Sequence, residues 1–481
     1  MADVVVIGAG MGGLGAALGL ERAGHRVTVI EQDQPPPTTS GDDAFTSWER
    51  RNVPQFQQAH GFSARSRNLL LRHAPGVVER LEADGVASTN IFKMLAPPEM
   101  HRPEDDEFTG FMSRRPAFEL AMRLEAEGRA GITFDTPTVA AGLVFAETGA
   151  APTVVGLRLQ DRRVLSADLV IDAGGRRSPV PAWLAEGGVQ IPSDVQDCGV
   201  TYFTRYFRRQ PDCPMPVQAI VAVRAEFENL MVIGFTGDHD TYAITLASAS
   251  WDDELRDLRH AWAWDAVVAS LPTAAPWTAP DTGVPLHNVS TMAGHRNVRR
   301  HLVVDGEPLV LGLLPVGDSL CTTNPAYGWG ASMALSYAFA ACEAFAPGNG
   351  DLRRLALDYD EAVATEADGV YQESAAMDRV RGYRWRGEPV PAEDEDEAER
   401  QSLIEESIVQ GMLRDAVLGR AFLRRANLLD PPRGILDDPE VLERATAMRD
   451  KFRGRPQNSS GPTRDELVAT IATGRPKAAE T

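Results

Sequence analysis

Residues 2–31 read ADVVVIGAGMGGLGAALGLERAGHRVTVIE, and this stretch decides the fold of the N-terminal part of the chain. Residues 4–7 form an apolar run typical of a parallel strand that is buried on both faces. Three glycines follow in the spacing G-x-G-x-x-G, namely Gly8, Gly10 and Gly13. This spacing suits a tight turn, a close approach of backbone to a pyrophosphate, and close packing of a helix on the strand. A second apolar strand ends at Glu31, where a carboxylate can accept ribose hydroxyls, so the stretch predicts a dinucleotide-binding site without distinguishing NAD from FAD.

The overall composition is that of a globular protein with two or three domains. The chain has 481 residues, of which 43% are hydrophobic and 24% charged. Its net charge of −20 argues against nucleic acid or an anionic membrane as a partner. The four cysteines include no C-x-x-C pair, which predicts reduced thiols rather than disulfides. The chain begins with a strand rather than a signal peptide and has no run long enough to span a bilayer, so we expect a cytoplasmic enzyme.

Periodicity along the rest of the chain predicts an α/β fold. Helices are expected at residues 68–83, 116–128, 251–271 and 331–345, and strands at residues 132–134, 138–145, 154–160, 164–172 and 302–316. Period-2 patterns predict a separate antiparallel sheet from residues 199–208, 217–224, 230–236 and 242–247. We expect a loop at residues 32–47 and a mostly helical C-terminal part. Within that part, the acidic run 393–399 is interpreted as a solvated linker or helix start, and residues from Arg453 onward as a loose tail.

Two later segments decide the cofactor. Residues 168–181 read DLVIDAGGRRSPVP, and residues 314–333 read LPVGDSLCTTNPAYGWGASM. Together with the N-terminal glycines, they resemble the para-hydroxybenzoate hydroxylase class of FAD-dependent monooxygenases, in its bacterial hydroxylase and epoxidase branch, over residues 1–345. The resemblance implies a discontinuous, doubly wound Rossmann-like domain that binds FAD, with an antiparallel β-sheet substrate domain and C-terminal helices. We assign these parts as follows: FAD-binding domain 1–80, 110–180 and 295–345; substrate-binding domain 81–109 and 181–294; C-terminal helical extension and tail 346–481.

The last of these segments supplies candidate contacts to the flavin half of FAD. Asp318 follows a strand, where its carboxylate can bind the ribitol hydroxyls. The following loop and helix start contribute Pro325, Gly328, Trp329, Gly330 and Ala331. The N–H groups and the positive dipole end of that helix would face the flavin N1 and C2 carbonyl, where the reduced ring carries negative charge.

Two finer resemblances add cofactor contacts. Residues 50–60, RRNVPQFQQAH, resemble the R-x-G-V-P-Q-x-x-H-x-H segment of bacterial flavin monooxygenases, with departures at Asn52 and Gln58. The segment retains His60 and Arg50; Arg50 is a candidate to bind the flavin or line its access path, with a surface arginine as the alternative. Residues 113–119, SRRPAFE, resemble an S-R-x-x-L-E segment whose arginine reaches FAD. This arginine is assigned to Arg115, with Arg114 as the competing assignment, and Val139 is assigned to the adenine-side backbone contact.

The implied chemistry is oxygen transfer. In this class, reduced FAD reacts with O2 to give a C4a-hydroperoxide, which transfers one oxygen atom to a hydrophobic small-molecule substrate by hydroxylation or epoxidation. His60 is a candidate proton donor or substrate contact, and a structural histidine bonded to backbone is an equally open interpretation. Tyr202 and Tyr206 share one face of their strand with Thr204 and are candidate substrate contacts. Core packing is an equally open interpretation for these aromatic residues, because the sequence does not say which face lines the pocket.

Several alternatives remain open at this stage. The chain has no second G-x-G-x-x-G fingerprint, which fits NAD(P)H as a transient donor acting directly or through a separate flavin reductase. An FAD-dependent reductase or dehydrogenase similar to the geranylgeranyl reductase branch is the first rival, and a non-catalytic flavin-binding accessory protein is the second. Halogenation is disfavoured, because Trp262-Ala-Trp264 is followed by Asp265 and Ala266 rather than by the rest of the W-x-W-x-I-P stretch of flavin halogenases. A metal is not expected, and the chain could be a monomer or a homodimer.

Overall fold

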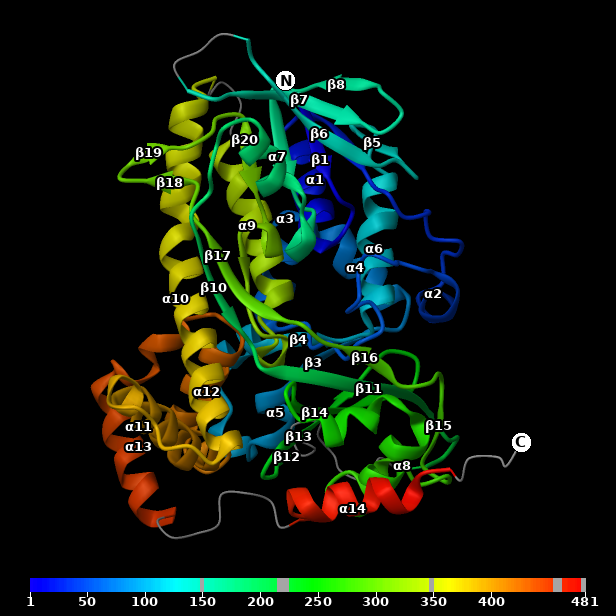
Figure 1. The fold of residues 1–481 in the computed structure, drawn as a ribbon, viewed down its shortest axis with the longest axis vertical. Coiled ribbons are helices and arrows are strands. Elements are labelled where there is room, and N and C mark those ends of the chain that lie inside the picture. The colour runs from blue at the N-terminus through cyan, green and yellow to red at the C-terminus, as the bar shows by residue number, and fades with distance from the viewer. Residues whose placement is uncertain (148–150, 214–224, 346–349, 453–460, 477–481) are drawn as a thin grey trace.

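The computed structural model describes residues 1–147, 151–213, 225–345, 350–452 and 461–476. A Rossmann-like domain occupies the upper part of Figure 1, and an antiparallel sheet, which we call the middle sheet, lies below it. C-terminal helices run along the side of both (Figure 1). This arrangement confirms the predicted fold class.

The five strands of the parallel sheet lie in the order β20–β9–β1–β2–β5. Their bounds are β1 Asp3–Ile7, β2 Arg26–Ile30, β5 Ile132–Asp135, β9 Leu169–Asp172 and β20 Leu313–Pro315. The carboxyl ends of parallel strands meet at one edge of a sheet. The three segments singled out in the sequence therefore converge at this edge, although they are far apart along the chain.

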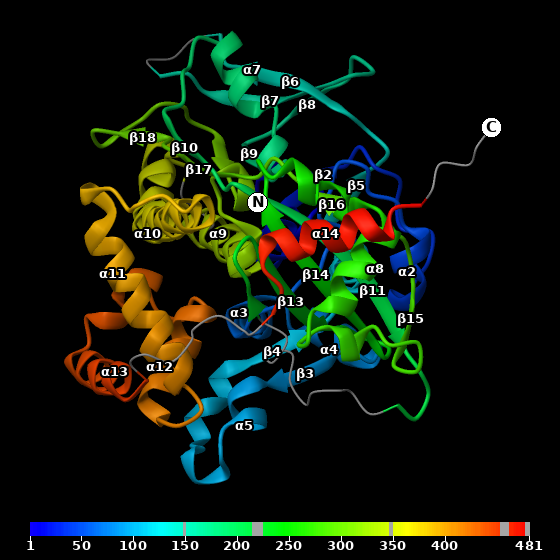
Figure 2. The ribbon, with the colours of Figure 1, turned by 60° about the horizontal axis from the view of Figure 1, so that its bottom comes forward.

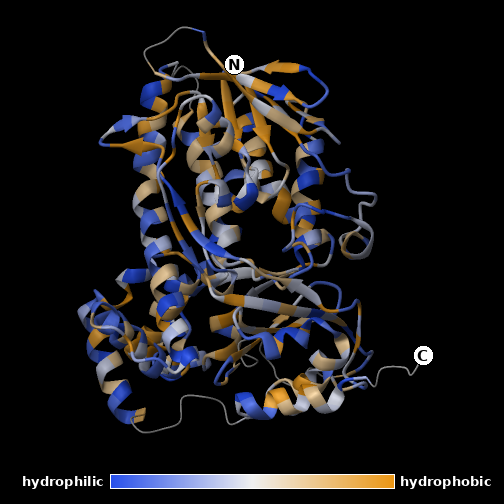
Figure 3. Ribbon diagram, in the orientation of Figure 1, coloured by the Kyte–Doolittle hydropathy of each residue, from blue (hydrophilic) through white to orange (hydrophobic). Residues whose placement is uncertain are grey.

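The two faces of the parallel sheet are covered differently. Val4 and Val6 pack under helices, namely α1 Met11–Arg22, α6 Arg115–Glu127 and α9 Gly330–Ala344. Val5 and Ile7 pack under a small antiparallel sheet and one helix, namely β6 Ala140–Phe145, β7 Val154–Leu159, β8 Val164–Ser166 and α7 Val180–Glu186. Apolar residues therefore run along strands that are buried on both sides (Figure 3). An antiparallel sheet covers the face where a doubly wound fold would place crossover helices.

Local predictions in this domain need four corrections. The strand predicted over 164–172 is two strands, because β8 pairs antiparallel with β7 whereas β9 pairs parallel with β1. The helix predicted over 68–83 is broken, because a residue before proline is disfavoured in helical geometry; the two pieces are α3 Ala64–His73 and α4 Pro75–Ala83. The predicted loop 32–47 contains a short helix, α2 Gly41–Ser47, and the apolar segment 302–316 contains β18 Val303–Val304 and β19 Glu307–Pro308 before β20.

The middle sheet confirms the predicted antiparallel sheet. Its order is β12–β13–β14–β11–β15, and β16 pairs with β11. The bounds are β11 Val200–Arg209, β12 Ala225–Glu226, β13 Leu230–Thr236, β14 Thr241–Ala249, β15 Gly283–Pro285 and β16 Ser290–Met292. The strand predicted at 217–224 lies outside the described residues. The predicted helix 251–271 is a 3-10 turn, Asp253–Arg259, followed by α8 Ala261–Ser270, because His260 between them is extended.

A three-stranded sheet and a hairpin lie outside the two main sheets. β10 Ser193–Asp197 pairs with β17 Arg296–Arg300, which in turn pairs with β21 Cys321–Thr322. Val180 and Leu184 of α7 share an apolar core with the sheet β6–β7–β8, and β10 pairs with β17, so both elements lie beside the segments assigned to FAD binding, whereas the boundary at residue 181 stays a prediction. A hairpin and a short helix lie below the Rossmann-like domain: β3 Ala87–Asn90, α5 Ile91–Leu95 and β4 Thr109–Met112.

The C-terminal part is helical, as predicted. α10 Leu352–Arg386 descends beside both domains, and a helical cluster follows, made of α11 Glu395–Leu403, a π-helical segment Ile404–Val409, α12 Ala416–Ala426 and α13 Pro439–Phe452 (Figure 1). The predicted loose tail is wrong over α14 Arg464–Gly474. This helix lies against α8, because its Leu467 and Ile471 are buried in the same apolar core (Figure 2). No described helix combines the length and apolar character needed to cross a membrane.

Candidate functional site

Most of the predicted site residues line one cavity. It has a volume of about 640 Å³ and lies where the carboxyl edge of the parallel sheet faces the middle sheet. The predicted residues on its wall are Gly8, Gly10, Glu31, Arg50, His60, Arg115, Val139, Tyr202, Asp318, Pro325, Gly328, Gly330 and Ala331. The predicted residues that do not line it are Gly13, Trp329 and Tyr206.

The glycine turn after β1 forms one end of the cavity. Gly8 has a φ of +95°, and a Cβ there would lie 2.7 Å from the carbonyl oxygen of Ala173. A Cβ on Gly13 would lie 1.9 Å from the carbonyl oxygen of Gly8, so Gly13 acts from behind the turn by letting α1 approach it. A Cβ on Gly10 would meet no heavy atom within 4 Å. Open space therefore lies at the N-terminus of α1, where unpaired N–H groups favour an anion.

Glu31 and Arg50 form a buried ion pair beside this turn. The Glu31 carboxylate accepts hydrogen bonds from the backbone N–H groups of Ala9 and Asp33, both at 2.9 Å, and pairs with Arg50 at 2.5 Å. About one of its four lone-pair positions remains for a ribose hydroxyl. Arg50 Nη1 also donates to Glu119 Oε2 at 2.8 Å. Arg50 therefore lines the cavity as predicted, but its guanidinium holds carboxylates in place rather than presenting a free positive charge.

Glu119 was not predicted as a site residue, although it lies in the quoted segment 113–119. Glu119 is fully buried and bridges the two arginines, with Arg115 Nε donating to its Oε1 at 2.7 Å. The i,i+4 spacing of Arg115 and Glu119 on a helix is the signal that could have revealed this residue.

His60 lies at the end of the same network. Its Nδ1 donates to the Gln58 carbonyl at 2.8 Å, and its Nε2 accepts from Arg115 Nη1 at 3.3 Å. Burial, together with the positive charge of Arg115, lowers the pKa of His60 to about 3. The ring is therefore neutral at physiological pH, which argues against the predicted role of proton donor. The bond to the Gln58 carbonyl is the one expected of a structural histidine, and the place of His60 on the cavity wall also suits a contact to substrate or cofactor.

Two carboxylates lie at the carboxyl ends of β9 and β20 and differ in their surroundings: Asp172 ends β9, and Asp318 follows β20. Asp172 accepts from the hydroxyl groups of Ser178 at 2.8 Å and Ser319 at 3.1 Å, so it fixes the turn that carries residues 173–178. Asp318 holds its loop through its backbone carbonyl, which accepts from Arg300 Nη1 at 3.1 Å. Burial raises the pKa of Asp318, while the Arg115 guanidinium acts in the opposite direction. Its carboxylate lies on the cavity wall and is available to hydroxyl groups of a ligand.

The loop before α9 forms the far end of the cavity. Gly328 has a φ of +72°, and a Cβ on Gly328 or Gly330 would meet nothing within 4 Å. α9 begins at Gly330, so its first N–H groups have no partner within the helix and carry the positive end of the dipole. Trp329 is buried in the apolar core beneath this turn, and its backbone carbonyl accepts from the N–H of Met333. Trp329 therefore positions the helix start from below.

Asp378 of α10 fixes the loop before α9 through hydrogen bonds. Asp378 accepts from Asn324 Nδ2 at 2.7 Å and from the Tyr327 hydroxyl at 2.7 Å, and it pairs with Arg381. Asn297 Nδ2 donates to the same carboxylate at 2.8 Å. Asp378 was not predicted from the sequence, because a single acid in a long helix carries no signal of its distant partners.

The middle sheet supplies the opposite wall, and the structure decides which face of β11 is used. Tyr202 and Thr204 line the cavity, and the Tyr202 hydroxyl donates to Asn324 Oδ1. Phe203 and Phe207 point the other way and pack with Trp264 of α8. Tyr206 is on the same face as Tyr202 but packs against Phe45 away from the cavity, so its predicted contact to substrate is not supported.

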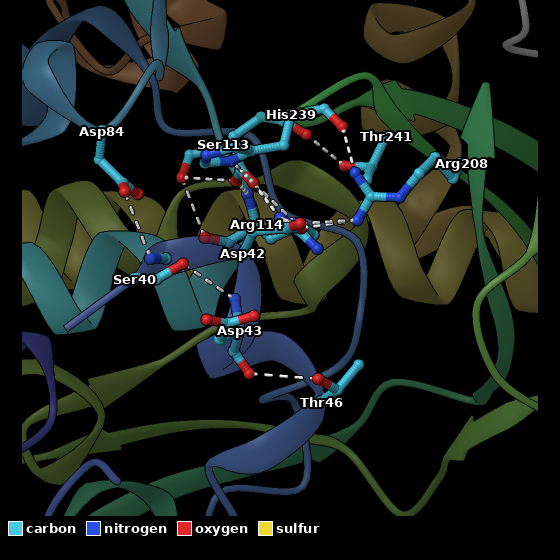
Figure 4. A network of polar contacts seen from close by, with 12 residues as sticks. Ser40, Asp42, Asp43, Thr46, Asp84, Ser113, Arg114, Arg208, His239 and Thr241 are labelled. Atoms are coloured by element: carbon cyan, nitrogen blue, oxygen red, sulfur yellow. Dashed lines mark hydrogen bonds and ion pairs between the residues drawn. The ribbon is translucent and has the colours of Figure 1, made fainter. Parts of the chain in front are cut away.

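An acidic cluster between the domains could suggest a metal site. The ligand atoms of Asp42, Asp238 and His239 lie within 4.8 Å of one another. Two guanidinium groups supply the positive charge there: Arg114 Nη2 lies 2.7 Å from Asp42, and Arg208 Nη2 lies 2.7 Å from the same carboxylate (Figure 4). Since Asp42 lies on α2 and Asp238 follows β13, this network ties the Rossmann-like domain to the middle sheet.

The same network separates the two candidate arginines. Arg114 is 1% exposed and donates through Nε to Asp238 Oδ1 at 2.8 Å, so it is committed to the domain interface. Arg115 lies on the cavity wall instead. The geometry therefore favours the assignment of the cofactor contact to Arg115.

The cavity fits an extended dinucleotide. The open space at Gly10 would take a pyrophosphate, and the space at Gly328 and Gly330 would take a flat ring against the start of α9. The carboxylates of Glu31 and Asp318 lie where ribose and ribitol hydroxyls need acceptors, and both line the cavity. Val139, just before β6, lies on the wall with its carbonyl paired to the N–H of Gln160.

Comparisons with known proteins agree with this fit. Residues 3–83 match the family of FAD dependent oxidoreductases. Protein Rv3254 of Mycobacterium tuberculosis is 27% identical over 452 residues, which cover 89% of each chain. The crystal structure of pqsL, a probable FAD-dependent monooxygenase from Pseudomonas aeruginosa, matches with a TM-score of 0.58 and 18% identity, over 80% of this chain and 98% of that one. The flavin-dependent halogenase CmlS matches with a TM-score of 0.62 and 17% identity, over 98% of this chain and 76% of that one.

Proposed function

We propose that this protein is an FAD-dependent monooxygenase that inserts one oxygen atom from O2 into a hydrophobic small molecule, by hydroxylation or epoxidation. The match of residues 3–83 to the FAD dependent oxidoreductases and the fold shared with a probable FAD-dependent monooxygenase support this proposal. The observation that carries the proposal is the cavity between the domains. It joins a dinucleotide-binding turn at one end to the loop before α9 at the other, and the middle sheet closes it from the opposite side.

FAD would be bound by the residues that line this cavity, and when reduced it supplies the oxygen-activating chemistry of the reaction. Gly8, Gly10 and Glu31 would hold its adenosine diphosphate half, and Asp318 would hold its ribitol chain. The first N–H groups of α9, with the positive end of its dipole, would stabilise negative charge on the reduced ring.

Other residues keep this arrangement rigid. Arg50, Glu119 and Arg115 form a continuous buried ion-pair network along one side of the cavity. Asp378 fixes the loop through Asn324 and Tyr327. A rigid wall keeps water away from the reacting atoms and holds the substrate close to the cofactor.

The proposed electron donor is NAD(P)H, which binds transiently or acts through a separate flavin reductase. This part of the proposal rests on the single dinucleotide fingerprint of the chain, which the adenosine diphosphate half of FAD would occupy.

Halogenation is not proposed, despite the fold shared with CmlS. Trp262 and Trp264 belong to α8, which covers the face of the middle sheet that points away from the cavity. The tryptophans that suggested a halogenase stretch are therefore structural residues of a helix on the far side of the sheet.

The test combines reduction with isotope labelling. The FAD-loaded protein is mixed with NADH or NADPH, with and without a flavin reductase, and is then screened against hydrophobic substrates under labelled O2. We expect flavin reduction in at least one mixture and one labelled oxygen atom in the product. Turnover without label would instead support a reductase or dehydrogenase, and a flavin that no donor reduces would support an accessory protein.

A further inference from the structure

A second cavity of about 480 Å³ adjoins the cavity proposed to bind FAD, which we call the cofactor cavity. The two cavities share lining residues from three places: Gly61, Phe235 of β13, and Gly328 in the loop before α9. A Cβ on Gly61 would lie 3.4 Å from Phe235 Cε1, so this glycine and this ring form part of the partition between the cavities. A molecule in the second cavity would therefore lie next to the flavin end of the cofactor cavity.

Three parts of the chain that are remote in sequence build this second cavity, which we call the helical chamber. β13 contributes Ile233, α5 contributes Ile91 and Leu95, and the C-terminal helical cluster contributes Ile404 and Leu423. The cluster packs against the rest of the chamber through Leu423, which shares an apolar core with Phe92 and Phe108. The C-terminal helices are thus a wall of the chamber and not only a cover for the Rossmann-like domain.

The polar groups of the chamber wall are largely committed to protein partners. Arg425 donates to Glu373 at 2.7 Å, and the Asn427 side chain accepts from the backbone N–H of Ala64 at 2.8 Å. Arg384 lies between two acids at one end, 3.4 Å from Glu405 and 3.9 Å from Glu226. Most of the remaining wall is apolar, which suits a ligand with few polar groups.

One segment of the wall is a π-helix, Ile404–Val409, and three of its residues line the chamber: Ile404, Glu405 and Val409. A π-helical turn inserts an extra residue and changes the direction of side chains on the helix, and such turns are frequent at functional sites. Here it lies where the C-terminal cluster faces β13 across the chamber.

We infer that the helical chamber is the substrate site and that the C-terminal helical cluster determines which substrates fit. This inference rests on the proposed function, because it assigns a place to the molecule that receives the oxygen atom. The substrate is a single, mostly apolar small molecule, since the chamber falls within the range of about 300–1,000 Å³ typical of sites for drug-sized ligands. Its reacting end lies at the partition formed by Gly61 and Phe235, beside the loop before α9.

Leu413 allows a test that leaves the fold intact. It lines the chamber, yet its side chain is 36% exposed, so Leu413→Trp narrows the chamber without filling a tightly packed core. Gln410 lines the chamber one turn earlier and is also exposed, so Gln410→Trp is a second, independent variant. Leu442→Trp is the matched control, because Leu442 is 42% exposed on α13 and does not line the chamber.

The probe is N-phenyl-1-naphthylamine, a neutral aromatic dye whose fluorescence rises in apolar sites, titrated into the FAD-loaded protein. We expect saturable binding that also changes the visible absorption of the flavin. Leu413→Trp and Gln410→Trp should each weaken binding at least ten-fold with unchanged flavin content, and Leu442→Trp should bind as the parent protein does. Failure of the parent protein to bind the dye, or wild-type affinity in both chamber variants, would overturn the inference. Absence of labelled oxygen in products would refute the proposed function alone, because dye binding does not depend on turnover.

Discussion

The glycine turn allows a prediction that separates folding from cofactor binding. Gly10→Ala and Gly13→Ala each add one methyl group to the same turn, but the surroundings differ. The Cβ at position 13 would lie 1.9 Å from the carbonyl oxygen of Gly8, whereas the Cβ at position 10 would meet no protein atom within 4 Å. The first variant should therefore damage the fold with or without FAD, and the second should affect FAD binding alone.

The expected magnitudes follow from these distances. Gly13→Ala forces α1 away from the turn, and overpacking of this kind costs about 1–3 kcal/mol or more. Gly10 has φ −82° and ψ −176°, which alanine adopts without strain. Alanine makes the unfolded chain stiffer, which raises the free energy of unfolding by about 0.4–1 kcal/mol. It is also a poorer N-cap than glycine, which lowers that free energy, so the net change in the unfolding free energy of the apoprotein should be less than about 0.5 kcal/mol. A methyl group in the space for the pyrophosphate should weaken FAD binding at least ten-fold, or about 1.4 kcal/mol.

The assay is urea unfolding of the apoprotein and the FAD-loaded protein, together with FAD titration followed by flavin fluorescence. Gly10→Ala should match the parent protein in the apo form and lose part of the stabilisation that FAD provides. If Gly10→Ala binds FAD as tightly as the parent protein, the open space at Gly10 is not the pyrophosphate site. If both apoproteins are equally destabilised, the reasoning from the two distances is wrong.

Three further predictions concern other parts of the site. Asp318→Ala should weaken FAD retention while leaving the apoprotein's urea midpoint near that of the parent protein, and unchanged flavin content would reject Asp318 as a ribitol contact. The pKa of His60 is about 6.5 in the unfolded chain and about 3 in the fold, so between these values the unfolded state binds more protons and the free energy of unfolding falls as the pH drops. His60→Gln should therefore reduce the loss of unfolding free energy between pH 6.5 and pH 5 by about 2 kcal/mol, as measured by urea unfolding of the apoprotein. Equal pH slopes for both proteins would contradict a neutral buried His60. Asp378→Asn leaves the buried Arg381 without its charge partner and should destabilise the protein by about 3–5 kcal/mol. Asp358→Asn, at a half-buried ion pair on the same helix, should cost less than about 1 kcal/mol.

The local parts of the site were predictable because each one depends on residues within a short segment of the chain. The turn at Gly8, the acid at Glu31 and the loop before α9 each combine strand, glycine and polar residue within a few positions. The parallel sheet then brings the carboxyl ends of its strands to one edge, so the convergence of these segments follows from the fold class. Errors at this level were local, such as the division of residues 164–172 between two sheets.

The environment of each residue was less predictable, because it depends on partners that carry no sequence signal. His60 was a reasonable proton donor by type, yet burial beside Arg115 keeps it neutral. Tyr202 and Tyr206 share a strand face, but only Tyr202 reaches the cavity, since Phe45 covers the other ring. The period-2 pattern identifies the two faces of a strand and does not say which packing partner each face meets.

By itself, the sequence determined a dinucleotide-binding α/β fold and the segments that form its binding edge, because backbone conformation and strand burial depend on nearby residues. Only the tertiary structure decided that Arg50 holds Glu31, that Asp378 braces the loop before α9, and that the C-terminal helices wall a chamber beside the cofactor cavity. Ion pairs and cavities form between side chains brought together from distant positions, and their energies depend on the burial and geometry that packing creates.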